Sequence, residues 1–174
     1  MRLPKVFQKK IALLQSLNVE FKANLEQLDI VSGYHQVIVA GYKSLKLIKY
    51  NKLDLTDGGM DSLTLDLMWH WTFDPRNGAL RSGISSGDIH LIKSNSLRNQ
   101  LFAWEDLVSD LNEDELQSRE HQLGSFDLFS TYTRSANRVA IVSEKFTPSA
   151  YLSDYAGLFG DPLFEDYLVN EPLI

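Results

Sequence analysis

Residues 83–87, Gly-Ile-Ser-Ser-Gly, fit the G-x-S-x-G pattern that surrounds the nucleophile of many hydrolases. In those enzymes the serine lies on a strained turn between a buried strand and a helix. The residues before Ser85, DPRNGALR, lack the pattern of a buried strand, and DIHLIKSNS after it contains its own turn. Histidines follow at positions 90 and 121, as a triad would require, but a late position in the chain is a weak criterion. We therefore interpret the segment as a Ser/Gly-rich helix end and disfavour a Ser85 hydrolase.

The four histidines are His35, His70, His90 and His121, and none of them has the spacing of a metal-binding pair. His35 falls on an apolar helical stripe, so we expect a buried, hydrogen-bonded side chain. Because no histidine pair has the spacing of metal ligands and Ser85 lacks the strand and turn of a nucleophile, the sequence predicts no catalytic residue, no metal and no cofactor.

An aromatic cluster is the second feature that could bind a molecule. Trp69 and Trp71 flank His70, and on a helix the two indoles would pack on opposite sides. Core packing is the simpler interpretation. The alternative is a ligand pocket formed by Trp69, His70, Trp71 and Trp104.

Charged residues gather in two short segments. The acidic group consists of Glu105, Asp106, Asp110, Glu113, Asp114, Glu115 and Glu120. It lacks the glycine and the ligand spacing of an EF-hand loop, so we interpret it as a solvated helix face. The basic group consists of Lys43, Lys46, Lys49 and Lys52. If the two helices that carry these groups were antiparallel partners, the charges would fix their pairing, as in coiled coils.

The longest element that must position these residues is a helix over residues 10–54, whose apolar residues recur at steps of three and four. Gly33 and Gly41 fall inside it, and each costs about 1 kcal/mol relative to alanine. A helix of about 44 residues is about 65 Å long. A compact globule of this chain length is only about 40 Å across. The chain therefore either bends at a glycine or forms an elongated hairpin, which we favour.

Shorter helices are expected next. Asp61 or Ser62 suits the start of a helix over residues 60–71. A brief helix over residues 77–86 would end at Gly87, which suits a left-handed cap.

The second long helix is expected over residues 95–131, capped by Ser94 or Asn95. Its apolar stripe changes phase near Asn112, which predicts a kink or a local change of winding. The pattern weakens beyond Thr131, where a helix end and a short strand are both compatible with the sequence.

The C-terminal part, residues 132–174, is expected to be irregular or short-helical. Asp161 followed by Pro162 is a typical helix start. The predicted fold is thus all-α: a single domain over residues 1–174, built as an elongated antiparallel helical hairpin or bundle with two long helices.

Composition and charge narrow the functional classes. The 174 residues are 44% hydrophobic and contain no cysteine, so the chain can bury a core and has neither a disulfide framework nor a cysteine redox site. A net charge of −6 argues against a nucleic-acid binder. Residues 1–52 hold 9 Lys and Arg and 3 Asp and Glu, a net of +6, whereas residues 53–174 hold 8 and 20, a net of −12. We expect the basic N-terminal part to pair with the acidic remainder of the same chain.

Residues 77–101 resemble the signature region of a family of uncharacterised bacterial proteins that usually carry one N-terminal transmembrane anchor. The matching positions are Gly78, Ala79, Ser85, Ser86, Gly87, Leu91, Ile92, Leu97, Arg98, Asn99 and Leu101. Residues 13–29 are similar to the first soluble helix of that family, and residues 160–171 to the stretch before its closing helix. Leu80 replaces the usual aromatic residue, and Gly83 stands where a larger residue is common.

The resemblance implies a helical domain held near a membrane, at the extracytoplasmic face of the inner membrane, and it implies no activity. Because these 174 residues contain no transmembrane helix and the family tends to continue into another helix at the position of Ile174, the chain is expected to be the soluble part of a longer protein or a shortened member. The leading hypothesis is a non-enzymatic helical interaction domain that acts through a protein partner or self-association. The alternative is a small-molecule or peptide-binding sensor domain that uses the aromatic pocket.

Overall fold

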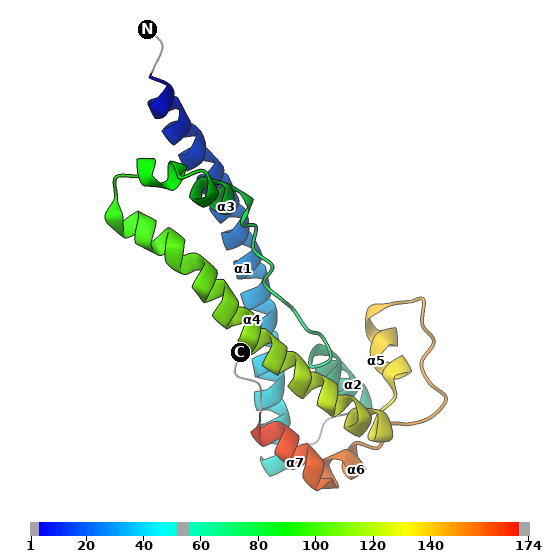
Figure 1. Ribbon diagram of the computed structural model, residues 1–174. Coiled ribbons are helices and arrows are strands. Elements are labelled where there is room, and N and C mark those ends of the chain that lie inside the picture. Colours follow the sequence, from blue (N-terminus) through cyan, green and yellow to red (C-terminus); the bar gives the residue numbers. More distant parts are fainter. Residues whose placement is uncertain (1–3, 52–55, 171–174) are drawn as a thin grey trace. The chain divides into compact units, whose positions relative to one another are not determined.

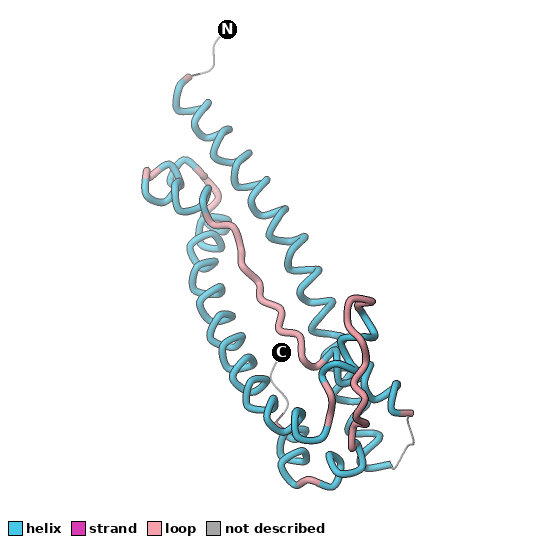
Figure 2. The backbone as a smooth tube through the Cα atoms, turned by 90° about the vertical axis from the view of Figure 1, so that its right-hand side faces the viewer, coloured by secondary structure: helices cyan, strands magenta, loops and turns pink. Residues whose placement is uncertain are grey.

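The computed structural model describes residues 4–51 and 56–170, which form seven α-helices and one 3₁₀ helix, η1 (Figure 1). The helices are α1 (Lys5–Asn51), α2 (Asp57–Asp66), α3 (Gly78–Ser85), η1 (Asp88–Leu91), α4 (Asn95–Tyr132), α5 (Ser135–Val142), α6 (Tyr155–Gly160) and α7 (Pro162–Val169). The described residues are helices joined by loops, as Figure 2 shows. The predicted all-α class with two long helices is confirmed.

Helix α1 is continuous through both of its interior glycines. It begins at Lys5, earlier than expected, and extends to Asn51, while the predicted end over residues 52–54 lies outside the described residues. The helix therefore has no break at Gly33 or Gly41.

The second helix differs from its prediction. Helix α2 spans Asp57–Asp66 and is capped by Thr56, whose hydroxyl accepts a hydrogen bond from the Gly59 amide at 3.2 Å. The expected cap at Asp61 or Ser62 is therefore wrong, because both residues lie inside the helix. Residues 69–77 are extended, so Trp69, His70 and Trp71 are not on a helix. Contacts of this segment with α1 override its local helical pattern.

The chain divides into two compact units, and each contains part of α1 and part of α4. Unit 1 comprises residues 1–32 and 72–113, and unit 2 comprises residues 33–71 and 114–174. That residues 1–174 form a single domain remains a prediction.

Unit 1 has a small core between α1, α3, η1 and α4. Its buried members are Leu17, Leu80, Ile89, Ile92 and Leu101. Phe21 and Trp104 extend it with an edge-to-face ring contact at 4.9 Å.

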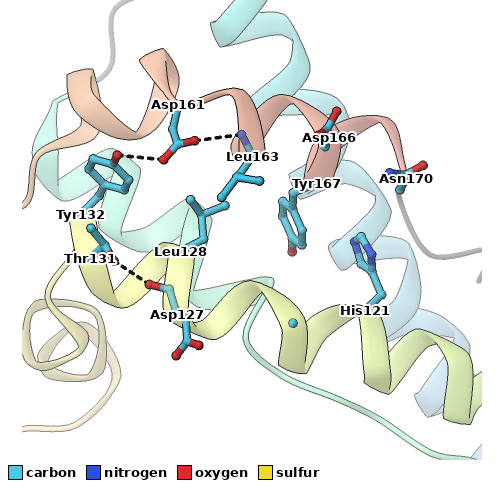
Figure 3. Close-up of a pocket in the computed structure, with 11 residues that line it drawn as sticks. His121, Asp127, Leu128, Thr131, Tyr132, Asp161, Leu163, Asp166, Tyr167 and Asn170 are labelled. Atoms are coloured by element: carbon cyan, nitrogen blue, oxygen red, sulfur yellow. Dashed lines mark hydrogen bonds between the residues drawn. The ribbon is translucent and has the colours of Figure 1, made fainter.

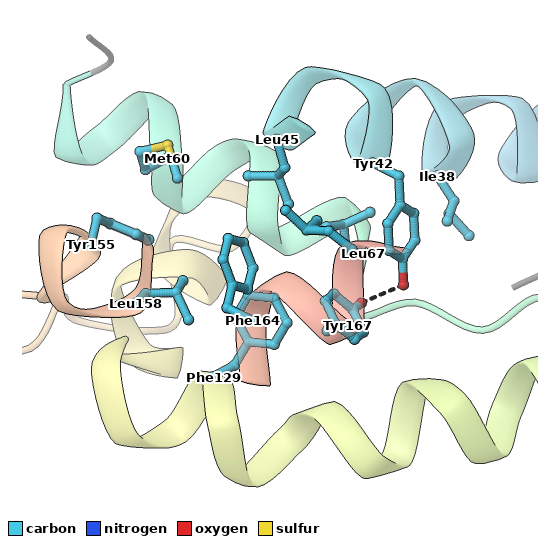
Figure 4. Close-up of a cluster of buried hydrophobic side chains, with 11 residues drawn as sticks. Ile38, Tyr42, Leu45, Met60, Leu67, Phe129, Tyr155, Leu158, Phe164 and Tyr167 are labelled. Atoms are coloured by element: carbon cyan, nitrogen blue, oxygen red, sulfur yellow. Dashed lines mark hydrogen bonds between the residues drawn. The ribbon is translucent and has the colours of Figure 1, made fainter. Parts of the chain in front are cut away.

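Unit 2 has the larger core, in which α6 and α7 pack against α1, α2 and α4 (Figure 4). Its buried members are Ile38, Tyr42, Leu45, Met60, Leu67, Phe129, Tyr155, Leu158, Phe164, Tyr167 and Leu168. The C-terminal helices thus complete this core, since they contribute about half of its buried side chains.

Within each unit, the segments of α1 and α4 run in the same direction (Figures 1 and 2). In unit 1, the buried Leu17 and Leu101 share a core, and Phe21 contacts Trp104 one turn further along both helices. The predicted antiparallel arrangement is therefore wrong. Within unit 1, the extended residues 72–77, which we call the return segment, run in reverse along α1, and α4 then starts in the same direction as α1.

Three local predictions from single residues are confirmed. Gly87 has a φ of 74°, in the left-handed region that favours glycine. The Ser94 hydroxyl accepts a hydrogen bond from the Leu97 amide at 3.2 Å. Asp161 caps α7 through the Leu163 amide at 2.8 Å.

Two further features concern α4 and the residues after it. Helix α4 remains helical through Asn112, next to the boundary between the units. Residues 135–142, where a strand was also compatible with the sequence, are helical as α5. Within the ranges that the structure describes, no helix combines the length and apolar character needed to cross a bilayer.

Candidate functional site

A row of polar side chains on α1 holds the extended return segment in unit 1. The Asn24 amide makes two hydrogen bonds to the backbone of Arg76, one to its N–H and one to its carbonyl, both at 2.8 Å. One turn earlier, the Glu20 carboxylate accepts from the amides of Ala79 at 2.6 Å and Leu80 at 3.0 Å. Both α1 side chains are buried. Glu20 therefore caps the N-terminus of α3 from another helix, where a negative charge is favourable.

Ser85 lies in the last turn of α3, where its hydroxyl donates to the Arg81 carbonyl at 2.7 Å. A helix precedes it, whereas a nucleophile elbow needs a strand and a strained turn. The serine therefore has the geometry of a helix end.

The residues of the predicted aromatic pocket belong to both units. In unit 2, Trp69, His70 and Trp71 border a cavity of only about 20 Å³, which has room for about one water molecule. Trp71 stacks on Tyr34 with ring centroids 3.7 Å apart, and its carbonyl lies 3.0 Å from Nε2 of His35. The partly buried His35 thus has the expected hydrogen bond.

Trp104 lies in unit 1, where it supports the core. Its indole N–H donates to Asn77 at 2.9 Å, and its ring makes edge-to-face contacts with the rings of Phe21 and Phe73. Trp71 and Trp104 thus make packing contacts, whereas Trp69 is 51% exposed.

A buried polar cluster in unit 2 joins α2 to α5 and α6. Arg138 is 1% exposed and donates to the hydroxyls of Thr133 at 2.6 Å and Ser135 at 3.0 Å. The Tyr155 hydroxyl donates to Asp61, and burial raises the pKa of Tyr155 to about 12. Within the part of the chain that the structure describes, Nε of Arg138 is buried without a hydrogen-bond partner, whereas its two terminal nitrogens and the Tyr155 hydroxyl are bonded. Buried polar groups that bond one another stabilise a fold, so we assign this cluster to fold stability.

Unit 2 contains a groove of about 420 Å³ between α4 and α7 (Figure 3). It is lined by His121, Gly124, Asp127, Leu128, Thr131, Tyr132, Asp161, Leu163, Asp166, Tyr167 and Asn170. Its α4 wall is one helix face, because the lining positions recur at steps of three and four. Gly124 leaves that face open, since a Cβ added there would meet no atom within 4 Å.

Acidic groups surround this groove. Three aspartates line it, and among the described residues of its lining there is no lysine or arginine. His121 stacks on Tyr167 with centroids 4.8 Å apart, and burial lowers the pKa of His121, which favours the neutral imidazole. Tyr132 donates to Asp161 at 2.8 Å, and this bond raises the pKa of Tyr132. The groove therefore presents acceptor groups and apolar surface to an occupant.

A second surface feature of unit 2 covers the end of α5 and the residues after it. Large apolar side chains here are Ile141 (48% exposed), Val142 (62%), Phe146 (54%), Tyr151 (74%) and Leu152 (80%). We call residues 141–152 the apolar segment. Sequence reasoning missed both this segment and the groove, because residues 132–174 carry no clear periodicity.

Comparison with known protein families, curated proteins and solved structures gives no match to this chain.

Proposed function

We propose that this protein is a non-enzymatic helical interaction domain that works by binding another protein surface, either a partner or a second copy. The apolar segment is the observation that carries the proposal. Five large side chains within twelve residues are about half exposed or more, whereas soluble monomers keep exposed apolar patches small. Covering such side chains on binding yields roughly 25 cal/mol per Å² of buried apolar surface.

Three polar residues of unit 1 hydrogen-bond to the protein backbone, which is compatible with a non-enzymatic function. Ser85 donates to a backbone carbonyl, and Glu20 and Asn24 bind the backbone of unit 1. The bacterial, membrane-proximal setting is proposed only from the resemblance of residues 77–101. An aromatic sensor pocket is the weaker candidate, because the cavity beside Trp71 has a volume of only about 20 Å³.

The test places a photo-crosslinking amino acid at Leu152 and, as a matched control, at the exposed Glu144 of the same segment. We expect an adduct of defined mass at position 152 and a much weaker one at 144, either with a partner in the native cells or with a second copy in the purified protein. Replacing Tyr151 and Val142 by serine should abolish that adduct. A strictly monomeric protein without an adduct at position 152 would contradict the proposal.

A further inference from the structure

The groove between α4 and α7 combines an apolar wall with an acidic rim. Leu128 and Leu163 line it together with the stacked rings of His121 and Tyr167, and Leu163 is 64% exposed. Asp127 and Asp166 are also exposed, one on each helix. An occupant that complements this site must carry positive charge beside a large apolar group.

The start of α1 has this chemistry. Lys5 and Lys9 are exposed and Lys10 is partly exposed, while Val6 is 62% and Phe7 is 47% exposed. The first turn of α1 contains no acidic residue. Lysines at a helix N-terminus are unfavourable, because the helix dipole already places partial positive charge there. An acidic partner would relieve this repulsion.

We propose that the groove of one copy binds the first turns of α1, Lys5–Lys10, from a second copy. This inference rests on the proposed function and names its partner. The lysines would pair with Asp127 and Asp166, and Phe7 would pack against the apolar wall. The partner is a second copy because the chain itself carries both complementary surfaces: three lysines without an acidic residue in Lys5–Lys10, and three aspartates in the groove.

Such a contact joins two different surfaces, so it is head-to-tail and builds rings or chains of copies. Lys9 also forms an ion pair with Asp88 at 3.7 Å, with the Lys9 side chain 66% exposed. Exposed pairs contribute only about 0–1 kcal/mol, so exchange of this pair for the groove would cost little.

The test uses two charge-reversed variants of the full chain in sedimentation experiments. One carries Lys5→Glu and Lys10→Glu, and the other carries Asp127→Lys and Asp166→Lys. In each variant alone, the helix start and the groove have the same sign of charge, so we expect monomers. In a mixture the charges are complementary again, so we expect association to return. The wild type should associate at low salt and dissociate as salt rises.

A variant with Asp106→Lys and Asp110→Lys is the matched control, because it makes the same charge change at exposed positions outside the groove. It should associate like the wild type. Phe7→Ser, which changes no charge, should also lose association, and circular dichroism should show native helicity for every variant. A wild type whose mass does not change with concentration, or variants that fail to associate when mixed, would overturn the inference. Association that persists in both charge variants would overturn it while leaving the proposed function intact.

Discussion

At the scale of single residues, the strongest constraints come from polar side chains that bind the backbone of a distant segment. Glu20 is 8% exposed and Asn24 is 2% exposed. Each satisfies two backbone groups in unit 1 that would otherwise be left without a partner. A buried backbone group without a partner is costly, so these two side chains determine where the return segment lies.

Glu20→Ala should therefore lower the free energy of unfolding by about 1.5–3 kcal/mol, because hydrogen bonds to a charged group are lost and two amides remain buried. Urea denaturation measures this change. Glu26→Ala removes the same side chain from an exposed position of α1 and should change stability by less than about 0.5 kcal/mol. Equal losses in both variants would show that Glu20 does not cap α3.

At the scale of elements, α1 is set by packing as much as by propensity. Gly33 has no atom within 4 Å of an added Cβ, whereas at Gly41 the Cβ would lie 3.0 Å from Cδ2 of the buried Leu67. The two glycines therefore have different roles in the same helix: one faces open space, and the other allows close approach of the chain after α2.

Gly33→Ala should raise the free energy of unfolding by about 0.5–1 kcal/mol, since alanine is the better helix former and meets no contact. Gly41→Ala should stabilise less or destabilise, because Leu67 must move. Thermal unfolding of the two variants, with identical chemistry in each, measures the difference. A larger gain at position 41 than at 33 would contradict the packing seen at Leu67.

At the scale of the whole molecule, the described residues build two cores that share no buried side chain. Leu80 is central to unit 1 and Leu158 to unit 2, and both are 0% exposed. Long helices contribute to both cores, so local sequence continuity does not coincide with the compact units.

Leu80→Ala and Leu158→Ala should each cost about 2.7–5 kcal/mol, the range for buried leucines. The two variants should accelerate hydrogen exchange in different helices. The first should accelerate exchange mainly in α3 and η1, and the second mainly in α6 and α7, because local stability follows the core that each residue fills. The same exchange pattern in both variants would show that the two cores open as one.

The sequence alone determined the features that depend on neighbouring residues. Apolar periodicity predicted both long helices, and local backbone chemistry predicted the cap at Ser94, the left-handed Gly87 and the start of α7 at Asp161. These structures form because the interacting groups are within a few residues of one another.

Only the tertiary structure decided the direction of α4 within each unit, the extended conformation of residues 69–77, and the groove and apolar segment of unit 2. The return segment is fixed in unit 1 by hydrogen bonds between residues more than fifty positions apart, such as Asn24 and Arg76. Such pairings leave no periodicity in the sequence. The groove likewise depends on where α7 packs on α4, which the residues of either helix do not encode separately.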